Sequence, residues 1–156
     1  MGDTYSKIFV ARWTDMDFNA HMRNTAYLDL AGDLRMMFFQ EHGFPPTEFS
    51  RLRIGPVIKR DELEYFQEVR LLEEVVATVA LAGGSSDGAR FRIRNEFFKQ
   101  DGTRVACLTS VGGWMDLNAR KRVPPPEALL AAIRKMPRTD DYEDIPERDR
   151  AGTAKR

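Results

Sequence analysis

A run of apolar residues with helical spacing begins near residue 24. Its members recur at intervals of three and four, as on one face of a helix: Tyr27, Leu30, Ala31, Leu34, Met37 and Phe38. Asn24 is of a type that caps helix N-termini, and Gly43 followed by Pro45-Pro46 ends the pattern. The spacing therefore predicts a helix from Asn24 to Glu41. Because three more apolar residues lie off this face, namely Leu28, Met36 and Phe39, we expect the helix to be largely buried.

Five further segments have the composition of β-strands. They cover residues 5–12, 56–66, 75–82, 90–99 and 104–117. In the fourth segment apolar residues alternate with arginines, which is typical of an antiparallel sheet with one face on a core. Asp101-Gly102 predicts a hairpin between the last two segments. Gly112-Gly113, inside the last one, predicts a bulge or a close approach by backbone or ligand.

The lengths of these elements match one another. The helix would be about 27 Å long at 1.5 Å per residue, and a ten-residue strand about 33 Å long. One helix lying along the concave face of a twisted, five-stranded antiparallel sheet would bury its apolar face, so the pattern predicts an α+β fold. Such a sheet has open edges, which favours a homodimer formed by edge pairing, or a homotetramer.

The composition favours a single domain with no net charge. Among 156 residues, 24 lysines and arginines balance 24 aspartates and glutamates, so we expect neither nucleic acid nor a membrane surface as a partner. Residues 1–7 lack the apolar stretch of a secretory signal and no apolar run could span a bilayer, which favours a cytoplasmic location. Cys107 is the only cysteine. A single cysteine excludes an internal disulfide and a multi-cysteine zinc site. The apolar residues around Cys107 predict that it lies in the core.

The C-terminal part differs in composition from the rest. After Pro124-Pro125-Pro126 we expect a short helix from Glu127 to about Met136, which would close a single domain of residues 1–136. In residues 137–156, 11 of 20 are charged, and only Tyr142 and Ile145 are sizeable apolar groups. We therefore expect this tail to be disordered or loosely docked.

The candidate chemistry lies just before the long helix, where Asp15, Asp17 and His21 precede its first turn. The N–H groups of a first helical turn lack intrahelical partners, so they can polarise a carbonyl or hold an oxyanion. A carboxylate base and an electrophile stabiliser can thus share one loop. Burial of Asp17 beside Phe18 and Met22 would raise its pKa towards the range of a useful base.

Other chemistries lack their required residues. Asp15-x-Asp17-x-Asn19 begins like a calcium loop, but alanines stand at the positions of the turn glycine and the bidentate glutamate. The second histidine, His42, is at the far end of the helix, so His21 has no partner for zinc. The chain has no Gly-x-Ser-x-Gly motif and no phosphate-binding glycine loop. We therefore expect no metal and no cofactor.

The stretch Thr14-Asp15-Met16-Asp17, followed by His21, Asn24 and Tyr27, resembles the acyl-CoA thioesterases of the hotdog fold, in their 4-hydroxybenzoyl-CoA thioesterase-like branch. That family has an aspartate, then Gly-His-Val-Asn-Asn and a tyrosine at the head of its long helix. Here Ala20 replaces the glycine, and Met22-Arg23 replaces Val-Asn. A weaker resemblance continues through residues 64–69, and the whole covers about residues 5–120.

The resemblance implies a thioester hydrolase for a fatty or aromatic acyl-CoA, or for an acyl carrier protein thioester. Asp17 would act as base or nucleophile, while the backbone N–H near Asn24 would hold the carbonyl oxygen. His21 would orient Asp17 or cap the loop. The active site would lie at a dimer interface.

Residues for substrate binding are less sharply defined. Tyr27 matches the tyrosine that stands at the start of the long helix in the family pattern. Arg23 could narrow or charge the mouth of a pocket. Arg90 and Arg92, with Arg94, could meet the phosphates of coenzyme A or form a solvated face. Aromatic residues of the helix and strands could line an acyl tunnel or simply form the core.

Two alternatives remain open. An enoyl thioester hydratase uses the same type of scaffold, but it would need an Asp-His pair on an element following the helix. A cystatin-like binding module also combines one helix with four antiparallel strands. That alternative leaves the pattern from Asp17 to Tyr27 unexplained.

Overall fold

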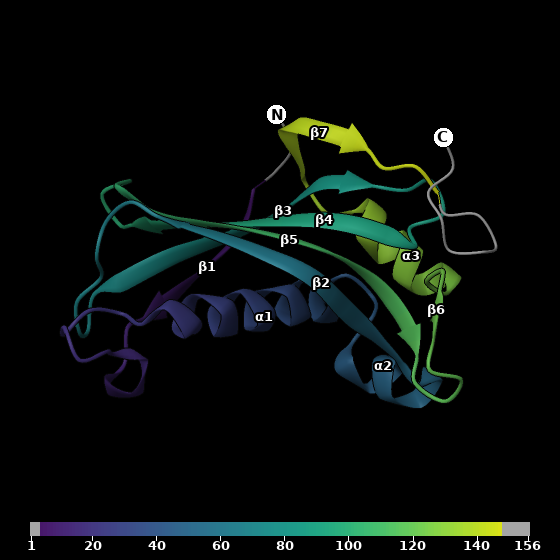
Figure 1. Cartoon of the computed structure of the whole chain (residues 1–156), viewed down its shortest axis with the longest axis horizontal. Coiled ribbons are helices and arrows are strands. Elements are labelled where there is room, and N and C mark those ends of the chain that lie inside the picture. Colours follow the sequence, from purple (N-terminus) through teal and green to yellow (C-terminus); the bar gives the residue numbers. More distant parts are fainter. Residues whose placement is uncertain (1–3, 148–156) are drawn as a thin grey trace.

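A computed structural model describes residues 4–147 (Figure 1). Its elements in chain order are β1 (Tyr5–Val10), the 3₁₀ turn η1 (Trp13–Asp15), α1 (Asn24–Glu41), α2 (Pro46–Leu52), β2 (Ile54–Tyr65), β3 (Glu74–Gly84), β4 (Arg90–Lys99), β5 (Arg104–Asp116), β6 (Lys121–Val123), α3 (Glu127–Arg134) and β7 (Arg138–Asp144). The order of the first strand, the long helix and the four long strands is the predicted one.

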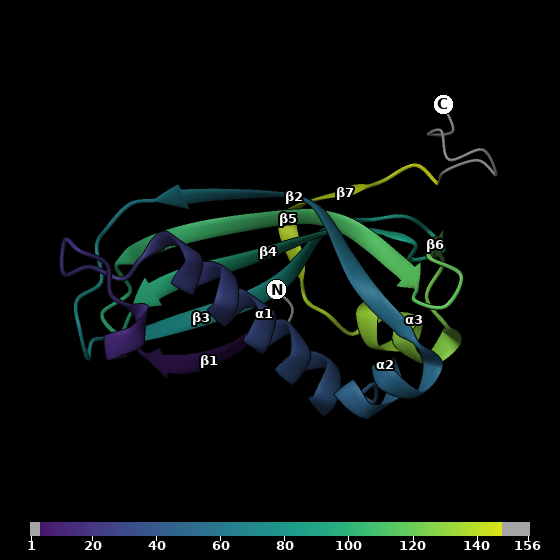
Figure 2. The same cartoon turned by 60° about the horizontal axis from the view of Figure 1, so that its bottom comes forward.

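All the strands belong to one curved sheet. Its main path has the order β1-β3-β4-β5-β2, and these five strands pair antiparallel. The helix α1 lies along its concave face (Figures 1 and 2). The predicted number of five strands is wrong, because two short strands extend the sheet to seven: β6 pairs with β5, and β7 pairs parallel with β3. The edge strands of the main path are β1 and β2.

The core lies between α1 and the inner face of the sheet. The predicted bounds of α1 are confirmed, and its buried residues include all of the predicted stripe except Met37, which is exposed. The inner residues Phe91, Ile93 and Phe97 of β4 are buried against the helix, while the arginines alternate to the other face. Cys107 is buried, as predicted, and burial raises the pKa of its thiol.

The predicted helix cap is wrong by one residue. Arg23 occupies the cap position, and Asn24 is the first residue of α1. The Asn24 side chain instead accepts a hydrogen bond from the Thr25 N–H, at 3.0 Å. A side chain at the first helical position cannot reach the N–H groups two or three residues on from the cap, which explains the different bond.

The close approach predicted at Gly112-Gly113 comes from backbone. A Cβ atom added to Gly112 would lie 2.1 Å from the Val57 carbonyl oxygen on β2. The pairing of β2 with β5 shifts its register directly beside this point, between Ile58 and Arg60. The irregularity therefore lies on the partner strand, and the glycine allows the two strands to approach.

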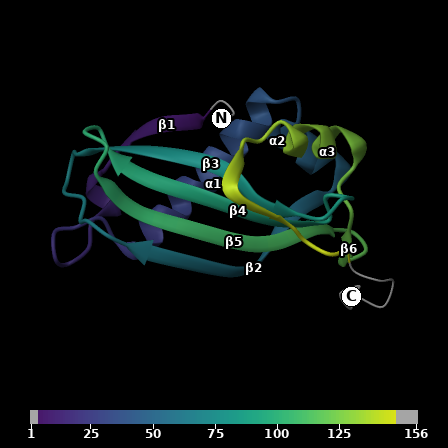
Figure 3. The ribbon, with the colours of Figure 1, turned by 90° about the horizontal axis from the view of Figure 1, so that it is seen from above.

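The prediction of a disordered or loosely docked tail is wrong for Arg138–Asp144, which forms β7 on the face of the sheet opposite α1 (Figures 1 and 3). Arg94 and Asp141 form an ion pair at 2.7 Å, and the Arg138 guanidinium lies 4.1 Å from the centre of the Tyr142 ring. The acidic residues of this segment thus meet the arginines of β4, which a count of charges along the sequence does not anticipate. Residues 148–156 lie outside the described part of the chain.

Acid is expected to weaken the docking of β7. Arg94 lowers the pKa of Asp141 from its ordinary value of 3.8 to about 2. The ion pair therefore stabilises the fold at pH values above the ordinary pKa of 3.8. Its contribution is lost as the pH falls through about 2. Because the carboxyl is largely exposed, the effect should be at most about 1 kcal/mol. Thermal unfolding of the native chain and of Asp141→Asn should differ at about pH 5 and converge near pH 2. A difference that persists in acid would contradict this assignment.

Candidate functional site

The loop between β1 and α1 is closed by hydrogen bonds around Asp17. The Asp17 N–H donates to the His21 carbonyl at 2.7 Å, and Asp17 Oδ1 accepts from the N–H groups of Asn19 and His21, at 2.8 and 3.1 Å. Ala20 has a positive φ of 61° in this loop. Since glycine adopts this region without strain, the geometry gives a physical reason for the glycine of the family pattern. Alanine here makes the same turn at some conformational cost.

Asp15 holds the loop to its neighbours. Its side chain is buried, and Oδ2 accepts the Arg12 N–H at 2.9 Å. Its carbonyl oxygen accepts the N–H of Arg23, the cap residue of α1, at 2.7 Å. On the other side, the Met22 N–H donates to the Val69 carbonyl, also at 2.7 Å. These bonds fix where α1 begins relative to Asp17.

Four predicted site residues, Asp17, His21, Asn24 and Tyr27, line one open cavity of about 410 Å³ at the N-terminus of α1. The rest of its wall comes from Met22 and from the end of β2 and the residues after it, Tyr65, Phe66, Gln67 and Glu68. The two segments that carry the family resemblance therefore meet in space.

The helix N-terminus offers a hydrogen-bond donor to this cavity. The Thr25 N–H is occupied by the Asn24 side chain, and the Ala26 N–H donates to the Arg23 carbonyl at 3.0 Å. Within residues 4–147 the Asn24 N–H has no hydrogen-bond acceptor. An unused N–H at the positive end of a helix, on the wall of a cavity, is suited to receive a carbonyl oxygen.

Tyr27 forms the buried floor of the site. Its ring makes edge contacts with Tyr65 and Phe97, with centroid distances of 5.6 and 5.3 Å. Burial, followed by the nearby Tyr65 and Asp17, raises the pKa of the Tyr27 hydroxyl to about 12. At neutral pH this phenol is therefore protonated, so it can donate a hydrogen bond but cannot act as a base.

His21 contacts Asp17 through its backbone. Its ring Nε2 lies 3.8 Å from Oε1 of Glu68, on the opposite wall of the cavity. The His21 backbone therefore helps to close the loop, and its ring lies across the site from Glu68. His42 lies at the C-terminal end of α1, where it stacks on Phe38 and its Nδ1 contacts the Phe38 carbonyl.

The expected burial of Asp17 is not provided by this chain. Asp17 is exposed, and Phe18, which was expected to cover it, is fully exposed. Met22 is buried, but in the core. The prediction that these two side chains shield the carboxyl is therefore wrong for the single chain, because the loop turns Phe18 outward.

The predicted arginines do not join the cavity within one chain. Arg23 bonds the Thr14 carbonyl at 3.1 Å and pairs with Asp29 at 3.7 Å, outside the cavity wall. Arg90 donates to the Pro146 carbonyl at 2.8 Å, and Arg92 lies 3.6 Å from Glu143. Arg90 and Arg92 thus contact β7 and the residues after it, on the other side of the sheet.

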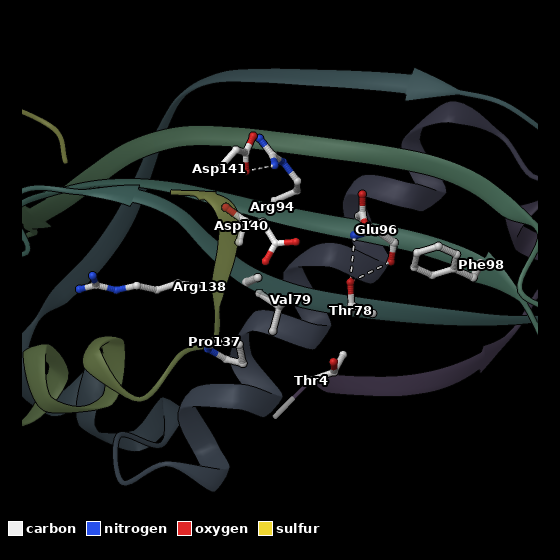
Figure 4. Close-up of a pocket in the computed structure, with 12 residues that line it drawn as sticks. Thr4, Thr78, Val79, Arg94, Glu96, Phe98, Pro137, Arg138, Asp140 and Asp141 are labelled. Atoms are coloured by element: carbon white, nitrogen blue, oxygen red, sulfur yellow. Dashed lines mark hydrogen bonds and ion pairs between the residues drawn. The ribbon is translucent and has the colours of Figure 1, made fainter. Parts of the chain in front are cut away.

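The same face holds a hollow of about 590 Å³ beneath β7. Figure 4 shows Arg94 paired with Asp141 there, beside Asp140 and Glu96. Its polar wall carries both signs of charge, and the sheet separates it from α1 (Figure 1).

The sequence reasoning missed a buried polar group on the inner face of the sheet. Arg35 of α1 points to Asn95 of β4 and Ser110 of β5, and both strand residues are fully buried. Asn95 continues the inward alternation of Phe91, Ile93 and Phe97, so its polar side chain at an apolar position was a readable signal.

A curved antiparallel sheet around one central helix is the hotdog fold, as the solved structures confirm. A protein of Staphylococcus aureus in complex with CoA has 18% identity and a TM-score of 0.76, with 88% of each chain covered. A 1,4-dihydroxy-2-naphthoyl-CoA thioesterase from Synechocystis has 13% identity and a TM-score of 0.75 over 85% of this chain and 96% of its own. The gentisyl-coenzyme A thioesterase BH1999 has 19% identity and a TM-score of 0.73 over 82% and 98%.

The family model of the Thioesterase-like superfamily matches residues 11–133, and the chain belongs to this family. The enzyme class predicted from the sequence, a thioester hydrolase, is thereby confirmed, and the cystatin-like alternative is removed. No match is found among curated proteins. In the described residues 4–147 we find no cluster of side chains that could hold a metal ion and no helix long and apolar enough to cross a membrane.

Proposed function

We propose that the protein hydrolyses acyl-CoA thioesters at the cavity beside the N-terminus of α1. The observation that carries this proposal is the convergence on one cavity of the Asp17 carboxyl, the unused Asn24 N–H and the Tyr27 phenol. A carboxylate beside a helix N-terminus provides the two functions that thioester hydrolysis needs, a base or nucleophile and a donor for the developing oxyanion.

In the proposed reaction the thioester carbonyl oxygen accepts the Asn24 N–H. Asp17 either removes a proton from an attacking water or attacks the carbonyl carbon itself. The carbon–sulfur bond then breaks, and CoA leaves as a thiolate, which needs little protonation. The acyl group departs as a carboxylic acid, directly or after water cleaves an aspartyl anhydride. The two groups that this reaction requires, the Asp17 carboxyl and the Asn24 N–H, belong to one chain.

We propose a fatty or an aromatic acyl group. Two of the structural neighbours are thioesterases for dihydroxynaphthoyl-CoA and gentisyl-CoA, which are aromatic substrates. The aromatic wall of Tyr27, Tyr65 and Phe66 suits either a planar ring or an alkyl chain. An acyl carrier protein thioester is the alternative carrier, and the cytoplasmic location stays a prediction.

The test is a hydrolysis screen with the full chain. Fatty and aromatic acyl-CoA thioesters, with matched acyl carrier protein thioesters, are supplied and the released thiol is measured. We expect turnover of at least one CoA thioester. The proposal fails if no member of the panel is hydrolysed faster than in buffer. If an enoyl-CoA instead gains water across its double bond, the hydratase alternative replaces it.

We further propose that the active unit is a homodimer that pairs along the β2 edge. This edge strand is exposed over most of its length, and it ends at Tyr65 on the wall of the cavity. Asp17 lines the same cavity and is exposed in one chain, so a second copy at this edge would lie beside it. Sedimentation equilibrium should give about twice the chain mass of 17.9 kDa. A monomer at working concentration would contradict this assembly, and four times the chain mass would indicate the tetramer.

A further inference from the structure

A second cavity of about 240 Å³ lies further along α1, between the helix, β2 and the inner face of the sheet. Most of its wall is apolar and includes Met36, Phe39 and Trp114. Two charged residues also line it, Arg35 and Asp61. The two charges have opposite signs, and a charge in an apolar cavity is tolerated only where neighbouring groups compensate it.

The Arg35 guanidinium is held in one orientation. Its Nε and Nη2 donate to Asn95 Oδ1 at 2.9 and 2.7 Å, and Nη2 also donates to Ser110 Oγ at 2.7 Å. Ser110 Oγ in turn donates to the Asp61 carboxylate on β2. Both intermediate residues are fully buried, so this network fixes the plane of the guanidinium.

The third nitrogen of Arg35 is unused. Within the described residues Nη1 donates no hydrogen bond, and it is also not sealed inside the protein. The only buried side-chain nitrogen or oxygen lacking a partner in residues 4–147 is Thr139 Oγ1. The Nη1 donors are therefore accessible, on a residue that lines the cavity.

The unused donors of Arg35 favour an oxygen acceptor in this place. Burial lowers the pKa of Arg35 to about 10, while the nearby Asp61 carboxylate acts in the opposite direction, and Arg35 remains a cation at neutral pH. Guanidinium groups match carboxylates in geometry as well as charge, and such hydrogen bonds are stronger than neutral ones. The apolar wall would meanwhile hold a hydrocarbon segment.

The two cavities are neighbours on the same pair of elements. Tyr27 and Tyr65 line the first, and the next residue of the helix, Leu28, lines the second together with Asp61 of β2. Arg35 lies 11 residues beyond Asn24, about 16 Å at 1.5 Å per residue. An acyl group whose carbonyl sits at the Asn24 N–H would need to be long to reach Arg35.

We propose that Arg35 is a specificity-determining residue, whose cavity takes the distal end of a long acyl group bearing an oxygen acceptor, a carboxylate above all. The placement of this end in an acyl-CoA rests on the proposed function. The preference for a carboxylate rests on the Arg35 network alone.

A binding measurement tests the preference without hydrolysis or CoA. Trp114 lines the cavity, and the second tryptophan, Trp13, is exposed, so Trp13→Phe leaves one local fluorophore. In this background the monomethyl and dimethyl esters of one long-chain dicarboxylic acid are titrated. The monomethyl ester retains a free carboxylate and should bind at least about tenfold more tightly, equivalent to about 1.4 kcal/mol. Arg35→Met should remove the preference, and Arg35→Lys should keep part of it.

A blocking variant tests the location. A Cβ added at Gly32 meets no atom within 4 Å, and this residue lines the cavity from α1. Gly32→Leu should retain the fold, because leucine favours helices more than glycine, and should weaken binding of both esters. Equal binding of the two esters overturns the proposal, as does an unchanged preference in Arg35→Met or the absence of a Trp114 response. Lost hydrolysis in the acyl-CoA screen would instead count only against the proposed function.

Discussion

Asp17→Asn is expected to lower kcat/KM for acyl-CoA hydrolysis by about 10²- to 10⁴-fold, the range of a positioned general base. Asparagine keeps the Oδ1 atom that accepts the Asn19 and His21 N–H groups, so the loop should retain its closure. The substitution removes only the negative charge and the basic oxygen. Most of the loss should fall on kcat, because the carboxylate acts in the transition state more than in substrate binding.

The measurement compares steady-state kinetics of the native chain and the variant on the best substrate of the panel. Asp33→Asn is the matched control, because Asp33 is an exposed aspartate of α1 that lines neither cavity. It should hydrolyse at the native rate. Circular dichroism and the melting temperature should be the same for all three proteins. A loss of less than about tenfold, or roughly 1.4 kcal/mol of barrier, would show that Asp17 is not the principal catalytic group.

Much of the candidate site was readable from the sequence because its residues are local. Asp17 and Tyr27 belong to one loop and the helix that follows it, and the apolar period of that helix is strong. The antiparallel order then brings the end of β2 to the same place. The local pattern and the resemblance thus located most of one wall of the cavity, whereas no site role was predicted for residues 65–68 of the other wall.

What the sequence did not predict depends on contacts between distant segments. The strand β7 pairs with β3, and its Asp141 meets Arg94, which lies 47 residues earlier in the chain. Arg35 and Asn95 are 60 residues apart, and neither is unusual in its local sequence except by its inward position. No local pattern specifies which polar side chains will meet across a core, since that choice is made by the sheet register. The exposure of Phe18 likewise follows from a loop conformation that the residue types alone do not determine.

Gly112→Ala is expected to destabilise the fold by about 3 kcal/mol, at the upper end of the usual cost of overpacking. The new Cβ would lie 2.1 Å from the Val57 carbonyl oxygen and 3.1 Å from the Ile58 Cα atom. The clash is with backbone, so no side chain can rotate to relieve it. Gly112 is also paired with Phe91 of β4, which prevents β5 from moving away. The strand β2 would have to separate from β5 instead, and with it would move Tyr65 and Asp61, which line the two cavities.

Gly55→Ala is the matched control, since it adds the same methyl group on β2. Its Cβ would lie 3.6 Å from a terminal carbon of the Leu117 side chain, an ordinary contact, and stability should stay within about 0.5 kcal/mol of native. Urea unfolding measures both variants, with equal slopes required for the comparison. If the Gly112 variant fails to fold at all, Gly55→Ala still shows whether the cost belongs to the close approach or to any added methyl group. Equal midpoints for the two variants would mean that β2 and β5 do not approach as closely as described, because the clash at Gly112 would then have no cost.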